Sequence, residues 1–172
     1  MKNSFSHALV LGLTMLAVVG SPTVRGDDFS YLTLRGLNTV TISFTGFKND
    51  LQRFGVDKEK LRAMIENRLQ NAGIKVVTAE QALKDPAAAQ MLVDLHFNVA
   101  EYRYYSYSLV LKVNEKVPLP GQTRGFVSQT VWSKGTYGTV LDTSLLRISD
   151  DLGELTGRFV SDHMRENAVA TE

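Results

Sequence analysis

Hydrophobic and polar residues alternate along several stretches of the chain, with the period of two that is typical of half-buried β-strands. We expect strands over these ranges: Leu37–Phe44, Ile74–Thr78, Met91–Val99, Tyr107–Lys116, Phe126–Trp132 and Thr139–Leu141. A turn is expected at Arg103–Ser106. Gly135 and Gly138 predict a second turn, or a bulge, over Lys134–Gly138.

Two longer stretches carry apolar residues three and four positions apart, which predicts amphipathic helices. The first helix begins after Asp57, a favourable N-cap residue, and ends at Gly73. One or two further helical turns are expected at Ala79–Lys84, which Asp85-Pro86 would end.

The last helix is expected from Leu145 to about Asn167, with Asp142 or Thr143 placed to cap it. Gly153 and Gly157 lie four residues apart on this helix, so they occupy one side of it. They predict a close contact there, either inside the fold or across a dimer.

The order of elements, β-α-β-β-β-β-α, is typical of an α+β fold. We expect an antiparallel-rich sheet of about four to five strands, with two helices packed on one face and the other face open to solvent or to a partner. Residues 27–167 are expected to form a single domain, and residues 168–172 a frayed tail.

The start of the chain resembles a secretory signal peptide, predicted to cover residues 1–26. Lys2 precedes an apolar run from Ala8 to Gly20, which is shorter than the roughly 20 residues that cross a bilayer. Cleavage is possible after Gly20 or Gly26, and the second site is preferred. The sequence therefore predicts an exported protein, periplasmic or secreted, with no transmembrane segment.

Charge and cysteine content narrow the choice of partners. Cleavage after Gly26 takes 2 of the 19 basic residues and none of the 18 acidic ones, which changes the net charge from +1 to −1. A balanced chain has no general attraction to polyanions, so nucleic acid is not an expected partner. The chain has no cysteine, which excludes disulfides, thiolate metal sites and a lipid-accepting cysteine.

No signature of a phosphate loop, a dinucleotide-binding turn, a zinc protease or a serine hydrolase occurs in the sequence, and no cofactor is expected. Asp94 and His96 point the same way from one predicted strand. They could supply two metal ligands or an acid and a base, but a solvated polar face explains the same alternation. His163 would stabilise the end of the last helix.

Tyrosine is concentrated in one place, with four of the six tyrosines in six residues. They could form a contact platform for a partner, or could stabilise a hairpin through cross-strand pairs. The candidate binding residues are Tyr102, Arg103, Tyr104, Tyr105 and Tyr107. Trp132 is expected in the core, with an exposed rim as the alternative.

Several segments resemble small bacterial envelope proteins: residues 56–77, the strand Met91–Val99, residues 131–138 and residues 148–167. The pattern is similar to that of periplasmic assembly modules, such as the lipopolysaccharide-assembly lipoprotein, the curli-secretion lipoprotein and the amino-terminal domain of the Tol-system propeller protein. The resemblance implies an assembly role in the cell envelope. The chain differs from the lipoproteins in lacking the cysteine that anchors them.

These observations favour a non-enzymatic binding or assembly domain of the envelope that contacts another envelope protein. The first alternative is a small-ligand carrier with a pocket between the sheet and the helices. The second is an envelope enzyme with a site at Asp94 and His96. The sequence does not determine the oligomeric state.

Overall fold

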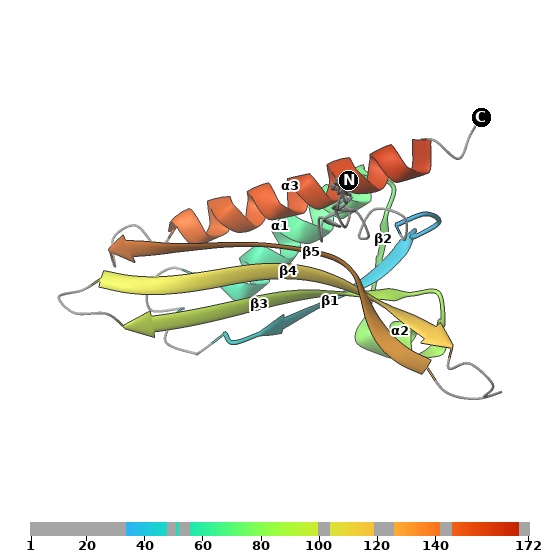
Figure 1. Ribbon diagram of the computed structural model, residues 1–172, viewed down its shortest axis with the longest axis horizontal. Coiled ribbons are helices and arrows are strands. Elements are labelled where there is room, and N and C mark those ends of the chain that lie inside the picture. The colour runs from blue at the N-terminus through green and yellow to red at the C-terminus, as the bar shows by residue number, and fades with distance from the viewer. Residues whose placement is uncertain are drawn as a thin grey trace, which may run out of the picture.

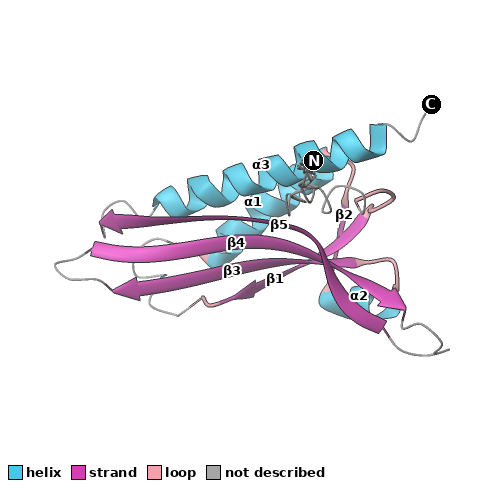
Figure 2. Cartoon of the chain, viewed as in Figure 1, coloured by secondary structure: helices cyan, strands magenta, loops and turns pink. Residues whose placement is uncertain are grey.

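The computed structural model describes residues 34–47, 51, 56–99, 104–118, 126–141 and 146–168. The predicted signal peptide and residues 169–172 of the predicted tail lie outside the described residues, whereas Ala168 is the last residue of the final helix. The elements in chain order, shown in Figures 1 and 2, are β1 (Thr39–Thr45), α1 (Lys58–Asn71), β2 (Lys75–Val77), α2 (Ala79–Lys84), β3 (Ala89–Val99), β4 (Tyr104–Pro118), β5 (Phe126–Leu141) and α3 (Leu146–Ala168). The α+β class and the predicted order of elements are confirmed.

The strands form one five-stranded sheet in the order β2-β1-β3-β4-β5. β3, β4 and β5 are an antiparallel meander, whereas β1 is parallel to both of its neighbours, β2 and β3. The sheet is therefore mixed rather than antiparallel throughout. The reason is that the connections leaving β1 and β2 each contain a helix, which returns the chain to the same end of the sheet.

The helices form where local chemistry favours them. The Asp57 carboxylate accepts hydrogen bonds from the backbone N–H groups of Glu59 and Lys60 and so caps α1, while Gly73, at φ +78°, follows the helix end. Thr78 and Gln81 form a reciprocal capping box at the start of α2. All three helices match the predicted ranges closely, including the short α2.

The core lies between one face of the sheet and the two longer helices, which run across that face side by side (Figure 1). Each helix contributes the apolar stripe that its sequence spacing predicts. The largest fully buried side chains are Trp132, Phe159, Leu34, Leu51, Ile65, Leu69, Ile74, Met91, Leu95, Leu109 and Leu111. α2 lies apart from this layer, below the sheet in the view of Figure 1.

Both predicted turns beside the long strands are wrong. Tyr104–Ser106 already belong to β4, and Lys134–Gly138 lie inside an uninterrupted β5. Gly138 stays in the strand because the Tyr107 ring, directly opposite, covers it: a Cβ there would lie 3.0 Å from the ring. The irregularity in the ladder falls instead between Val113 and Asn114.

Gly153 and Gly157 make their close contact inside the fold, and with a side chain rather than a backbone. The guanidinium of Arg68, on α1, lies against both glycines, and its Nη1 donates a hydrogen bond of 2.7 Å to the Gly153 carbonyl. A Cβ at Gly153 would lie 3.1 Å from the same guanidinium. The two glycines therefore let a charged side chain join the helices.

The segment that precedes β1 is fastened to the end of α3. Asn167 donates from Nδ2 to the Leu34 carbonyl at 3.0 Å and accepts from the Gly36 N–H at 2.8 Å. His163 is buried, and its Nε2 donates to the Leu37 carbonyl. The sequence analysis predicted that His163 would stabilise the end of its own helix. Its side chain bonds instead to the segment before β1. We call these contacts the terminal clasp.

Candidate interaction surface

The helices α1 and α3 cover only one face of the sheet (Figure 1). Because side chains alternate between the two faces along each strand, every second residue lies on the face that these helices do not cover. The register places these residues side by side on it, and we call them the open face: Asp94, His96, Asn98, Tyr104, Ser106, Ser108, Val110, Tyr137, Thr139 and Leu141. Most are exposed or half-buried polar residues. Between Tyr104 and Tyr137 the register places the short hydroxyl side chains of Ser106, Ser108 and Thr139.

Asp94 and His96 do lie on the same face, 3.3 Å apart between Nε2 and the nearer carboxylate oxygen. Asp94 also accepts a hydrogen bond of 2.8 Å from Thr45 Oγ1, and Lys112 Nζ lies 3.7 Å from its other oxygen. The described residues contain no cluster of three or more histidine, aspartate or glutamate side chains able to hold a metal. The carboxylate thus has neighbours from three strands, and the imidazole is largely exposed.

The structure separates the tyrosines that the sequence grouped together. Tyr104 is 47% exposed on the open face. Tyr105 points to the opposite face and stacks on Phe97, with 4.9 Å between ring centroids. Tyr107 is buried and donates a hydrogen bond to Asp151 of α3. Strand alternation divides them, so they do not form one platform. Tyr102 and Arg103 lie outside the described residues.

Burial of the Tyr107 hydroxyl raises its pKa to about 12, and the adjacent Asp151 carboxylate contributes in the same direction. Folding therefore favours the protonated phenol. This stabilisation is complete below the ordinary tyrosine pKa of 10.0 and is lost as the pH rises through about 12.

We accordingly expect wild-type stability to fall between pH 9 and pH 12 more steeply than that of Tyr107→Phe, which keeps the ring but has no proton to lose. Urea unfolding of both proteins across this range measures the difference. The other titrating groups are the same in both proteins and cancel in the comparison. Parallel pH profiles would contradict a stabilising role for the Tyr107 proton.

Tyr137 is the open-face residue that the sequence reasoning missed. It is 87% exposed, and the register sets it in a row with Ser108 and His96 on the neighbouring strands. Gly135 and Gly138 led to the prediction of a turn or bulge there, so Tyr137 was not assigned to a strand face. Continuing the period of two from Trp132 to Val140 would have placed Tyr137 on the face away from the core.

Trp132 belongs to the core, as expected, and not to this surface. Its side chain is 1% exposed, and its ring meets the edge of Phe159 with 5.3 Å between centroids. The indole N–H donates a 3.0 Å hydrogen bond to the Asp162 carboxylate on α3. The contact joins β5 to the last helix.

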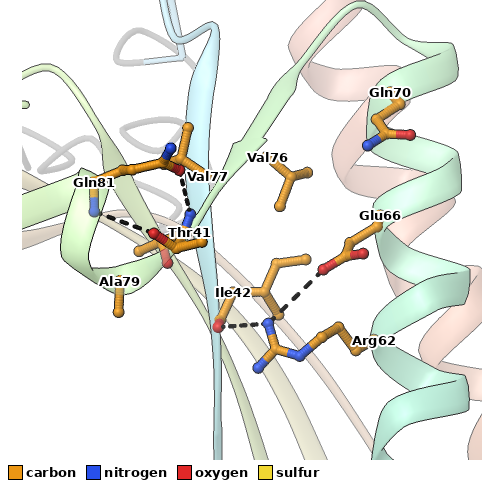
Figure 3. A pocket seen from close by; sticks show the side chains of 10 residues that line it. Thr41, Ile42, Arg62, Glu66, Gln70, Val76, Val77, Ala79 and Gln81 are labelled. Atoms are coloured by element: carbon orange, nitrogen blue, oxygen red, sulfur yellow. Dashed lines mark hydrogen bonds and ion pairs between the residues drawn. The ribbon is translucent and has the colours of Figure 1, made fainter.

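A cleft of about 410 Å³ opens between α1, the strands β1 and β2, and the start of α2 (Figure 3). Several of its polar side chains already have partners within the protein. Arg62 Nη1 donates to the Ile42 carbonyl at 3.2 Å and lies 3.9 Å from Glu66, and Gln81 is engaged in the α2 capping box. The cleft could hold a small polar molecule, but these groups are satisfied without one.

No protein-family model matches the chain, and no curated protein is significantly similar to it. Within the described residues, no helix is both long enough and apolar enough to cross a membrane.

Solved structures with a similar arrangement include several bacterial lipoproteins. A minor lipoprotein from Acinetobacter baumannii is 6% identical, with a TM-score of 0.38, and the match covers 74% of this chain and 90% of that one. The PelC dodecamer from Paraburkholderia phytofirmans is 15% identical, with a TM-score of 0.42 and coverage of 73% and 87%. Rare lipoprotein B from Shewanella oneidensis is 16% identical, with a TM-score of 0.32 and coverage of 77% and 96%.

Proposed function

We propose that the chain is a non-enzymatic binding module, exported to the bacterial cell envelope, that contacts another envelope protein through the open face. The observation that carries the proposal is the pair of exposed rings, Tyr104 and Tyr137, on a sheet face that α1 and α3 leave uncovered. Tyrosine is enriched in protein interfaces, because it contributes a large contact area and one hydroxyl at a small cost in conformational entropy.

The rest of the open face suits a protein partner better than a charged polymer. Asp94 and Lys112 face each other across β3 and β4, so the charges there are partly compensated. Ser106, Ser108 and Thr139 offer hydroxyl groups that can donate or accept hydrogen bonds. Leu141, 41% exposed, adds an apolar contact opposite Tyr104.

The proposal is tested by photo-crosslinking in living cells. A photoreactive residue is placed at Tyr104 or at Tyr137, and, as a matched control, at Arg158, an exposed position on α3. We expect one discrete protein adduct from both open-face positions and none from Arg158. Mass spectrometry of the adduct identifies the partner.

Tyr137→Ala supplies the quantitative arm of this test. Its ring is almost entirely exposed, so we expect the thermal midpoint to stay within about 1 °C of wild type while the adduct yield from Tyr104 falls about tenfold. Equal adducts from Arg158, or none from either open-face position in folded, exported protein, would reject the open face as the binding surface.

A small-ligand carrier is the second candidate, and the cleft beside Arg62 and Glu66 is the observation that favours it. A ligand held there would compete for the Arg62 guanidinium. A screen of small polar molecules by thermal shift distinguishes the two functions, because Tyr137→Ala should leave a cleft ligand's effect unchanged.

A further inference from the structure

The far end of the β4–β5 hairpin turns away from α1 and α3 as a two-stranded ribbon, and α2 lies beside it (Figure 1). We define the ribbon arm as Asn114–Pro118 of β4 and Phe126–Thr130 of β5, which pair beyond the irregularity next to Val113. All five β5 residues of the arm are exposed. Because neighbouring side chains of a strand point to opposite faces, both faces of β5 meet solvent there.

The ribbon arm is held in place. Lys116 Nζ donates to the carbonyls of Ala82 and Asp85, at 2.6 and 3.1 Å, and so ties the arm to the C-terminal end of α2. Thr130 Oγ1 donates to Asn114 Oδ1 across the two strands at 2.8 Å. A strand that is already fixed loses little conformational entropy when another strand pairs with it, so the arm is preorganised for such pairing.

β5 is the last strand of the sheet, and among the described strands it pairs only with β4. Edge strands usually carry a charge or a proline that discourages pairing with other chains. Phe126–Thr130 reads Phe-Val-Ser-Gln-Thr, which has no charge, proline or glycine, and most of these residues favour strands. This part of the edge is therefore open to a further strand.

The opposite edge of the sheet is different. β2 is only three residues long, and next to its end the Ile42 carbonyl accepts a hydrogen bond from Arg62. A short strand and a guanidinium are both devices that block the addition of a strand. The contrast indicates that one edge is protected while the other is available.

We propose that the β5 edge of the ribbon arm pairs with the same edge of a second copy of this chain, antiparallel and about a two-fold axis. Two identical strands meet in such a pairing, so any charge near the axis would face its own copy. Phe126–Thr130 carries none, and this neutrality is what fits a second copy. The product is a continuous ten-stranded sheet, in which both open faces remain accessible.

The test uses the full mature chain. Ser128→Lys with Gln129→Lys places four like charges at the axis of the dimer, on side chains that are exposed in the monomer. We expect sedimentation equilibrium to show a wild-type dimer whose dissociation constant rises at least about 100-fold in this variant. Ser161→Lys with Asn71→Lys adds the same charge at exposed helix positions and should leave the dimer unchanged.

A second measurement locates the contact. The chain has no cysteine, so single cysteines introduced from Val127 to Thr130 can crosslink only to the same position of another copy. We expect mild oxidation to give a covalent dimer, with the highest yield at the position nearest the axis. A wild-type chain that stays monomeric up to about 100 µM would overturn the proposal. So would a dimer that survives the Ser128→Lys, Gln129→Lys pair, or one that forms no crosslink in this range.

Discussion

Gly46→Ala is expected to destabilise the protein by about 2–5 kcal/mol, although it adds one methyl group. Gly46 follows β1 at φ +73°, where an L side chain is strained by about 1–2 kcal/mol. In addition, the new Cβ would lie 2.0 Å from the Leu95 carbonyl oxygen of β3, so the backbone of one strand must move. Overpacking of this kind costs about 1–3 kcal/mol more.

Gly73→Ala is the matched control for this substitution. Gly73 has nearly the same backbone angle, φ +78°, but no atom lies within 4 Å of the position its Cβ would take. We expect it to cost only the conformational part, about 1–2 kcal/mol. Urea unfolding of both variants separates strain from steric contact, and equal losses would show that β3 gives way to the methyl group without cost.

Trp132→Ala is expected to lower the free energy of unfolding by about 3–5 kcal/mol, a large part of the stability of an ordinary domain. The side chain is fully buried between β5 and α3, and its loss leaves Phe159 facing a cavity. It also removes the hydrogen bond that the indole N–H donates to the Asp162 carboxylate. Circular dichroism with urea measures the effect, since the variant lacks the single tryptophan of the chain.

Trp132→Phe separates the two contributions. It retains most of the ring volume but removes the N–H, so a loss of about 1–2 kcal/mol is expected. Asp162 keeps Arg165 as a second partner at 2.9 Å, which limits the cost. If both variants lost the same amount, the hydrogen bond and not the packing would account for the role of Trp132.

The parts of the fold that could be predicted from the sequence are those that depend on neighbours in the chain. Asp57 caps α1, Thr78 precedes α2, and the strand pattern of Met91–Val99 recurs in β3, all from local spacing. The parallel pairing of β1 depends on which strands meet in space. The continuity of β5 depends likewise on Tyr107, which covers Gly138 from the neighbouring strand.

The candidate site was predictable only in part, for a related reason. A surface made of several strands is set by the register between them, and a single strand boundary changes which side chains share a face. Placing Tyr104–Ser106 in a turn removed the alternation that separates Tyr104 from Tyr105 and Tyr107. The same treatment of Lys134–Gly138 hid Tyr137, whereas Asp94 and His96, inside a strand of clear period, were placed correctly.

The terminal clasp bears on when this fold can be completed. Asn167 forms hydrogen bonds with Gly36 and Leu34, which precede it in the sequence by 131 and 133 positions. The clasp thus joins the two ends of the described chain. A polypeptide that is synthesised, or threaded through a membrane channel, from its N-terminus presents Leu34 long before Asn167 is available. Contacts of such high sequence separation form slowly, because the intervening loop must first close. The terminal clasp is therefore among the last contacts that this chain can form, because one half of it lies at the end of α3.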